Sequence, residues 1–309
     1  MSNIEKIDLE LGGFAVSFRP QMGGNMVRLQ HKNSGVEVLR TPPDDETYRA
    51  KPEIWGMPVL MPPNRICDGK FVYQQRLYQL PVNEPMPRHT CLHGIILHKA
   101  WDFKQTGSNS VEMRISYPGS AANEGWMHTF EAVLQYEFSE NSVAQTLVFN
   151  NTSELTMPLM AGFHSAFNLP DNASFYLDAD NVNRTLDDLR KIVDGNTEIL
   201  PDWQQFRTLK HGERVLGHCA MKRNGKTNAE FLIRYPDQKW QMRYLLPEPW
   251  QEWVIWNNSG EENFICAEPQ SCRIDAMNIN LPLAKAGVIE LTPGASQTFY
   301  ASIVMEKFV

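Results

Sequence analysis

Two histidines in apolar surroundings are candidates for proton transfer. His93 lies in the segment CLHG and His164 in AGFHSAFNLP, among apolar residues and glycines rather than among surface charges. Histidine is the one side chain whose ordinary pKa lies between pH 5 and 8, so either ring can act as an acid or a base near neutrality. Taken alone, each is more typical of a histidine that serves packing.

A glutamate at position 268 is the matching candidate base. Glu268 follows the apolar run FICA and directly precedes Pro269. We expect the run to form a strand that the proline ends, which presents the carboxyl group at the strand end near the core. Partial burial raises the pKa of a carboxyl group and makes it a more useful base. A rim residue that caps a strand fits the local sequence equally well.

Three histidines within ten residues raise the question of a metal site. His89, His93 and His98 resemble in number the ligand sets of metal-binding β-barrels. On a strand, however, the spacing puts His93 and His98 on opposite faces, and Pro87 and Gly94 interrupt any regular element. The spacing therefore favours a loop that holds no metal.

Other residues are suited to hold a sugar. Asn64 and Arg65 follow two prolines, and a rigid guanidinium group there can donate hydrogen bonds to hydroxyl groups, although a lone loop arginine is more often exposed or ion-paired. In PEPWQEWVIWNN, the aromatic ring of Trp256 is nearest to the Glu268 segment and is a candidate platform for a sugar ring. We expect Trp250 and Trp253 to pack in the core or at its rim.

The composition is that of a globular protein with a small-molecule partner. With 309 residues, 42% of them hydrophobic, the chain can bury a core without disulfides, and we expect one domain over residues 1–309. A net charge of −7 argues against nucleic acid. The charged N-terminus and the absence of an apolar run of about 20 residues argue against secretion and a membrane span. Five cysteines without a C-x-x-C pair indicate reduced thiols, so we expect a cytoplasmic protein.

Short stretches of alternating apolar and polar residues predict an all-β protein. Turn-forming pairs such as Asp-Gly at 68–69 and Asn-Gly at 224–225 separate them, which favours antiparallel strands in a sandwich or barrel. Residues 185–195 combine an N-cap threonine with a terminal glycine and predict a short helix. The proline-rich residues 41–63 predict a long ordered loop. The predicted strands include FAVSF, FVYQQRLYQL, VEMRISY, FEAVLQYEF, SVAQTLVFN, AEFLIRY and QTFYASIVMEKF.

Five segments, in this order, resemble the aldose 1-epimerase (galactose mutarotase) family across nearly the whole chain. They are PQMGGNMVRLQHKNSGVEVLR, PNRICDGKFVYQQRLYQLPVN with the LHG that follows it, GFHSAFNL, ICAEPQSCRIDAMN and LTPGASQTF. The resemblance implies a large antiparallel β-sandwich of the galactose mutarotase-like type with few short helices. It also implies a groove that holds a sugar, and no metal or organic cofactor.

The same resemblance implies roles for individual residues. His164 matches the acid that protonates the ring oxygen, and Glu268 matches the base that removes the proton of the anomeric hydroxyl. His93 and Arg65 match groups that hydrogen-bond the sugar. The full set of candidate sugar contacts is Asn64, Arg65, His93 and Trp256. We expect a sugar substrate, no nucleic-acid or membrane partner, and a monomer or homodimer.

The chain departs from the family pattern at two places. An aspartate that usually contacts sugar hydroxyls is replaced in VLGHCAMKRNG, where Gly217 or His218 stands. The segment after the acid reads Ser165-Ala166-Phe167 instead of an H-P-Y-F-like sequence. These departures place the chain among divergent members and leave its sugar undefined.

Alternative functions follow from these departures. A hexose-phosphate mutarotase would need arginines beside the groove, for which Arg88 and Arg273 are the candidates. A non-catalytic carbohydrate-binding or sensor protein could keep the fold without turnover. A glycoside hydrolase normally uses two carboxylates, and Glu268 alone has a convincing setting.

Overall fold

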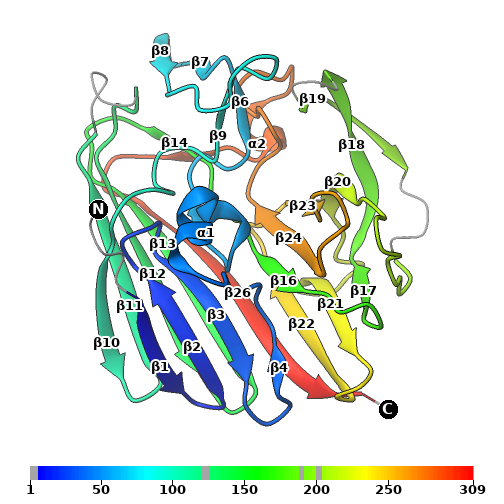
Figure 1. Cartoon of the computed structure of the whole chain (residues 1–309). Coiled ribbons are helices and arrows are strands. Elements are labelled where there is room, and N and C mark those ends of the chain that lie inside the picture. Colours follow the sequence, from blue (N-terminus) through cyan, green and yellow to red (C-terminus); the bar gives the residue numbers. More distant parts are fainter. Residues whose placement is uncertain (1–5, 120–124, 188–190, 200–203, 309) are drawn as a thin grey trace.

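Two large antiparallel sheets form most of the molecule (Figure 1). The computed structural model describes residues 6–119, 125–187, 191–199 and 204–308. Helices are few and short, so the prediction of an antiparallel all-β sandwich is confirmed. The predicted strands all lie in β-structure, and the stretch FVYQQRLYQL forms a two-stranded hairpin.

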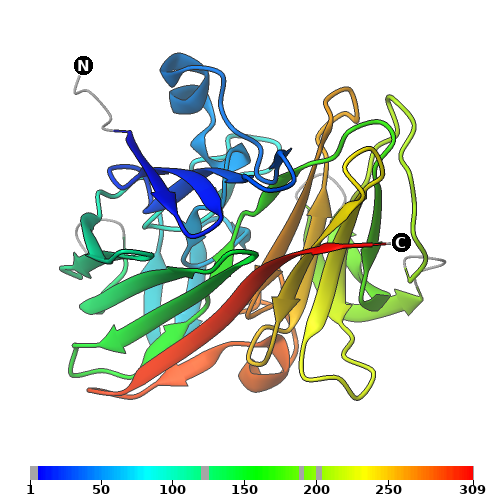
Figure 2. The same ribbon diagram turned by 90° about the horizontal axis from the view of Figure 1, so that it is seen from below.

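The first sheet has eight strands, with the long C-terminal strand near its middle. In Figure 2, this red strand runs between the green strands and the yellow strands of the same sheet. The last strand of the chain therefore pairs on its two sides with segments that are far apart in sequence. In spatial order, the strands are β10 (Asp102–Gly107), β11 (Ser110–Tyr117), β12 (Phe130–Phe138), β13 (Ser142–Asn151), β26 (Ser296–Lys307), β22 (Trp240–Leu246), β21 (Ala229–Tyr235) and β17 (Ser174–Leu177).

The second sheet carries the candidate site. Its path in space is β19 (Ile192–Ile199), β18 (Ala179–Asp187), β20 (Leu216–Met221), β23 (Glu252–Trp256), β24 (Phe264–Gln270), β15 (Gly162–Phe163) and β5 (Val59–Leu60), with β16 (Ala166–Asn168) also paired to β24. Because side chains alternate along a strand, β23 sends Trp253 and Ile255 into the main core and Val254 to the opposite face. The ring of Trp253 lies 6.3 Å from that of Tyr244 in the first sheet. This packing fixes which face of β23 is left for a ligand.

Smaller elements complete the fold. A four-stranded sheet holds β1 (Ile7–Leu11), β2 (Phe14–Arg19), β3 (Asn25–His31) and β4 (Val36–Glu37). Three two-stranded pairs are β6 (Arg65–Cys67) with β9 (Thr90–Leu92), β7 (Lys70–Tyr73) with β8 (Arg76–Gln79), and β14 (Met157–Leu159) with β25 (Ile289–Leu291). The helices are α1 (Asp45–Ala50), the 3₁₀ turn η1 (Pro52–Ile54) and α2 (Leu283–Ala286).

The predicted helix at 185–195 is wrong. The described part of this segment belongs to β18 and β19, which pair as an antiparallel hairpin with Thr185 opposite Val193; residues 188–190 lie outside the described part. Ile192 and Val193 are buried in a cluster with Ile274. Tertiary burial of β-branched side chains thus overrides the local capping signals. Gly195 has a φ of +89°, but within a strand rather than after a helix.

Two further expectations need correction. Residues 41–63 are not one loop, because they hold α1, η1 and β5. The Asp44 side chain caps α1 by accepting a hydrogen bond from the backbone N–H of Thr47. Pro269 does not end its strand, since β24 continues to Gln270.

The register of β24 explains why a proline is tolerated at position 269. The backbone N–H groups of Ala267 and Ser271 donate to Ser165 and Ala161, so an N–H at position 269 would point toward the same edge. That edge is interrupted between β15 and β16, and His164 lies in the interruption. The missing donor therefore falls where the ladder is already open.

The main hydrophobic cluster takes residues from both large sheets and from the four-stranded sheet. The expectation of one domain over residues 1–309 stays a prediction. All five cysteines are free, as their spacing predicts. Within the described ranges, the helices are too short and too polar to cross a membrane.

Gly94 allows the loop with His93 to lie against the strand end before Asn64. Its φ is +71°, and a Cβ atom there would lie 2.0 Å from the carbonyl oxygen of Met61. We expect Gly94→Ala to lower the free energy of unfolding by about 1–3 kcal/mol more than Gly35→Ala. Gly35 has the same left-handed backbone but open space around it, so its substitution measures the backbone strain alone. Equal losses in urea denaturation would contradict this prediction.

Candidate active site

A cavity of about 640 Å³ lies on the face of the second sheet that points away from the main core. Its floor comes from three neighbouring strands, where His218 of β20, Val254 of β23 and Glu268 of β24 stand opposite one another in register. Loops between the other elements form its walls. The volume is typical of a small-molecule site. The wall residues include Glu53 of η1, Arg65 of β6 and the loop residues Lys51, Asn64, Glu84, Arg88, His93 and His164.

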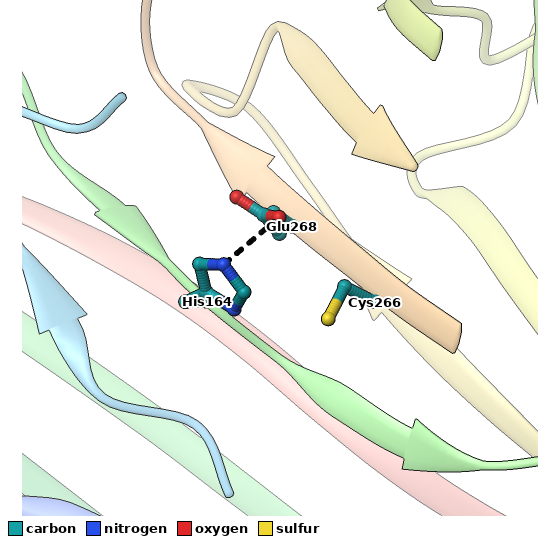
Figure 3. Close-up of side chains that lie close together, drawn as sticks. All are labelled: His164, Cys266 and Glu268. Carbon is teal, nitrogen blue, oxygen red and sulfur yellow. Dashed lines mark ion pairs between the residues drawn. The ribbon is translucent and has the colours of Figure 1, made fainter. Parts of the chain in front are cut away.

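His164 and Glu268 meet in this cavity. The Nε2 atom of His164 lies 3.3 Å from the Oε1 atom of Glu268, and the two side chains are only 5% and 3% exposed. Figure 3 shows the imidazole ring pointing from the segment between β15 and β16 toward the carboxyl group on β24. The interruption between β15 and β16 places the histidine at this point, and the backbone N–H of His164 is held by the carbonyl of Pro58.

Burial shifts the pKa values of Glu268 and His164 so that the neutral form of each side chain is favoured. It raises the pKa of Glu268 to about 8, although Arg65 and a hydrogen bond from Gln270 oppose the shift. Burial lowers the pKa of His164 to about 4. Between these two values the pair holds one proton. An imidazole and a carboxyl group in contact can therefore exchange one proton without a change in net charge.

Arg65 reaches the cavity as part of an ion-pair cluster. Its Nε and Nη2 atoms donate to both carboxylate oxygens of Glu84, at 2.7 and 3.0 Å. Glu84 also accepts from Arg88 and Thr90, both at 2.6 Å. Burial opposes the ionisation of Glu84, but these hydrogen bonds hold its pKa down to about 2. The guanidinium plane of Arg65 is thus fixed, and its Nη1 atom points toward Asn64 at 3.4 Å.

Two further rings surround His164. The ring of His93 lies 5.0 Å away, edge to face, and that of Trp256 lies 6.1 Å away. Burial lowers the pKa of His93 well below its ordinary value, so this ring is neutral near pH 7. Its Nδ1 atom is buried and has no hydrogen-bond partner among the described residues. Asn64 and His93 are joined through their backbones at 2.8 Å, and both have left-handed φ angles.

The structure brings all six candidate residues to one cavity. Of the other histidines, His218 also lines this cavity, whereas His89 and His98 do not. His89 donates from Nδ1 to a carboxylate oxygen of Asp68 at 2.8 Å, and His98 is exposed. Trp250 and Trp253 are fully buried in the core. The six residues at the cavity are Asn64, Arg65, His93, His164, Trp256 and Glu268.

One group of side chains has the composition of a metal site. The ligand atoms of His164, Cys266 and Glu268 all lie within 4.8 Å of one another (Figure 3). Cys266 and Glu268 share a face of β24, but burial raises the pKa of the Cys266 thiol well above its ordinary value. A metal ion would have to displace the proton of this thiol in order to bind all three side chains.

Sequence reasoning missed several residues of the cavity. Glu84 lies between β8 and β9 in an irregular segment, and Asn183 lies in the segment that was expected to continue into a helix. Val254 reads as an ordinary core residue of a strand. Gly217 and His218, the two candidates for the place of the family's aspartate, both line the cavity. The continuous apolar run of residues 253–256 in β23 was the one available signal, because such a run predicts a strand that is buried on both faces.

The fold is that of the galactose mutarotase-like proteins. A galactose mutarotase-like protein from Clostridium acetobutylicum has a TM-score of 0.89 and 28% identity, covering 98% of this chain and 95% of its own. A galactose 1-epimerase from Lactobacillus acidophilus shares the fold with a TM-score of 0.76 and 17% identity, covering 98% and 95%.

The family model described as aldose 1-epimerase matches residues 5–303, so the chain belongs to this family. The uncharacterized protein YihR of Escherichia coli K12 is 24% identical over 247 residues, which are 74% of each chain.

The raised pKa of Glu268 predicts a pH-dependent stability. The folded state binds the proton of Glu268 more tightly than the unfolded chain does. The contribution of this proton to the free energy of unfolding is therefore complete below about pH 4.5 and is lost as the pH rises through about 8. We therefore expect Glu268→Gln to become progressively more stable than the wild type over this range. Urea denaturation between pH 5 and 9 measures the difference.

The control for this measurement is Glu261→Gln, which removes an exposed carboxylate that contacts His211. A constant difference between Glu268→Gln and the wild type across the pH range would show that the buried carboxyl group has no raised pKa.

Proposed function

We propose that the protein is an aldose 1-epimerase that interconverts the α and β anomers of an aldose by opening and reclosing the ring. The observation that carries the proposal is the buried contact of 3.3 Å between His164 and Glu268 on a cavity of sugar-binding size. Anomer exchange needs one group that removes a proton and one that supplies it at the same carbon. Membership of the aldose 1-epimerase family supports this reaction class.

In the proposed reaction, Glu268 removes the proton of the anomeric hydroxyl while His164 protonates the ring oxygen. The bond between C1 and the ring oxygen breaks, and an open-chain aldehyde forms. Rotation about the C1–C2 bond presents the other face of the aldehyde. The two proton transfers then run in reverse, and the ring closes as the opposite anomer. The proton count is balanced at each step.

The protonation state of the pair supports this division of roles. Burial favours a neutral imidazole and a protonated carboxyl group. The reactive form, imidazolium with carboxylate, contains the same single proton in a different place. Sugar hydroxyls and the nearby Arg65 would stabilise the carboxylate, so substrate binding itself favours the reactive form.

The remaining residues would hold the substrate. Arg65, fixed by Glu84, and the neutral ring of His93 are donors suited to the oxygen atoms around the anomeric carbon. Asn64 offers an amide beside them, and Trp256 offers an apolar ring face. We further propose that the protein works in the cytoplasm as a monomer or homodimer, in agreement with its five free cysteines.

The structure gives less support to a sugar phosphate as substrate. Arg88 lines the cavity but is paired with Glu84 at 2.6 Å, and Arg273 is paired with Glu252 at 3.4 Å. Arg88 is therefore neutralised by Glu84, and Arg273 is not among the residues that line the cavity. A protein that binds a sugar without catalysing anomer exchange could have the same cavity. Measuring the rate of anomer exchange separates this alternative from an enzyme.

Substitution of the paired residues tests the proposal. We expect Glu268→Gln and His164→Asn each to lower kcat by about 10²–10⁴-fold, because each removes one proton-transfer group. Polarimetry with freshly dissolved α-glucose and α-galactose measures the rate above the spontaneous one.

The surface pair His211 and Glu261, which lie 2.9 Å apart and are well exposed, provides matched controls. His211→Asn and Glu261→Gln should retain the wild-type rate. If the wild type leaves the spontaneous rate of every common aldose unchanged, the proposal fails, and sugar binding in calorimetry would then identify a sensor.

The single shared proton predicts a bell-shaped pH profile of kcat/KM. Below about pH 4 the pair gains a second proton and has no base, and above about pH 8 it loses its proton and has no acid. Enzymatic rates from pH 3 to 10, corrected for buffer catalysis, measure both limits. A rate that continues to rise above pH 9 would contradict a shared proton.

A further inference from the structure

A second polar group faces the same cavity at a distance from the acid–base pair. His218, on β20, stands opposite Val254, which stands opposite Glu268. Side chains that pair across antiparallel strands point to the same face, and all three line the cavity. Since neighbouring strands lie about 4.8 Å apart, the backbones of His218 and Glu268 are roughly 10 Å apart. A single pyranose ring with its hydroxyl groups fits between two polar side chains with this separation.

The ring of His218 lacks partners within the described residues. It is 7% exposed, and neither Nδ1 nor Nε2 has a hydrogen-bond partner there. Buried polar atoms without partners are costly, and they are retained where a ligand satisfies them. The apolar side chain of Val254 separates this ring from Glu268. The floor of the cavity therefore has a polar group at each end and an apolar side chain between them, which suits the apolar C–H face of a sugar ring with hydroxyl groups on either side.

Burial keeps His218 neutral although a carboxyl group lies beside its ring. Oε2 of Glu252 lies 3.8 Å from Nε2 of His218 and accepts a hydrogen bond from Asn183 at 2.8 Å. Arg273 lies 3.4 Å from the other oxygen of Glu252. Burial, assisted by Arg273, lowers the pKa of His218 to about 3. A neutral imidazole has one donor and one acceptor, which are the complements of a hydroxyl group and not of a phosphate or a carboxylate.

We propose that His218 recognises the hydroxyl groups at C3 and C4 of an uncharged aldose, on the side of the ring opposite the anomeric carbon. The inference rests on the proposed function for the orientation of the sugar, because C1 must lie at Glu268 and His164. The ring carbons farthest from C1 then lie over β20. His218 would set which aldoses the protein accepts, while the acid–base pair sets the reaction.

Deoxy sugars test this assignment. The probes are D-glucose and its 2-deoxy, 3-deoxy and 4-deoxy analogues, with dissociation constants from calorimetry and kcat/KM from polarimetry. In the wild type, we expect removal of the C3 or C4 hydroxyl to weaken binding by about 3- to 10-fold, as for one or two hydrogen bonds. In His218→Leu this penalty should disappear, whereas the penalty for 2-deoxyglucose should stay unchanged.

Two more variants keep the test sharp. His218→Gln is close in size to the leucine variant but keeps an amide donor and acceptor, so it should retain part of the penalty for the C3 or C4 hydroxyl. His211→Leu, at the surface, should behave as the wild type does. Comparison of the leucine and glutamine variants removes any shared effect on folding.

The two proposals fail differently. If the sugars bind with the expected pattern but no anomer exchange is accelerated, the assignment of His218 stands and the proposed reaction fails. If exchange is accelerated but His218→Leu loses the same factor with every sugar, or loses nothing, the assignment of His218 is overturned. Failure of all four sugars to bind would overturn it as well.

Discussion

The burial of Glu268 against His164 is the interaction on which the rest of the site depends. A buried carboxylate without an ion-paired partner is costly, and proteins reduce the cost by protonating the group or by pairing it. Here the partner is an imidazole that is itself too buried to hold a charge cheaply. The result is a pair with one proton that both groups can hold, which is the property a reaction needs when it moves a proton on and off two oxygens of one substrate.

The position of Arg65 keeps this pair from becoming a permanent salt bridge. A free arginine next to Glu268 would lower the pKa of the carboxyl group and hold it ionised. Instead, the guanidinium group is bound through two nitrogen atoms to Glu84, which Arg88 and Thr90 also hold. Arg65 still opposes the rise in the pKa of Glu268, but it does not cancel it. The network therefore supplies a fixed donor to the cavity while leaving the acid–base pair unsatisfied.

The sequence predicted the parts of this arrangement that local pattern controls. Alternation of apolar and polar residues predicted the strands. The resemblance to a known family, and not local pattern, implied a common cavity for Arg65, His164 and Glu268. Local signals failed where tertiary contacts decide. The capping residues near Thr185 indicated a helix, but burial of Val193 against Ile274 makes the segment a hairpin.

Two failures concerned the site itself. Pro269 was expected to end its strand, but the hydrogen-bond ladder beside it is already open at His164, so the missing N–H is tolerated. Glu84 had no sequence signal, because an acidic residue in an irregular loop is most often exposed. The role of Glu84 depends on its contact with Arg65. The pairing of β6 with β9 brings the side chains of these two residues together. Contacts between loops were thus beyond any periodicity argument.

The second sheet also determines the dimensions of the cavity. The core face of β23 is filled by Trp253, which packs against Tyr244 of the other sheet, so the register of β23 cannot slip by one residue without burying the cavity face. The same register aligns His218, Val254 and Glu268 across three strands. Strand spacing, which is nearly invariant, then sets the distance between the two polar ends. Tight packing on the core face of the sheet thereby fixes the distance between His218 and Glu268 on the cavity face. That distance limits which ligands can contact both side chains at once.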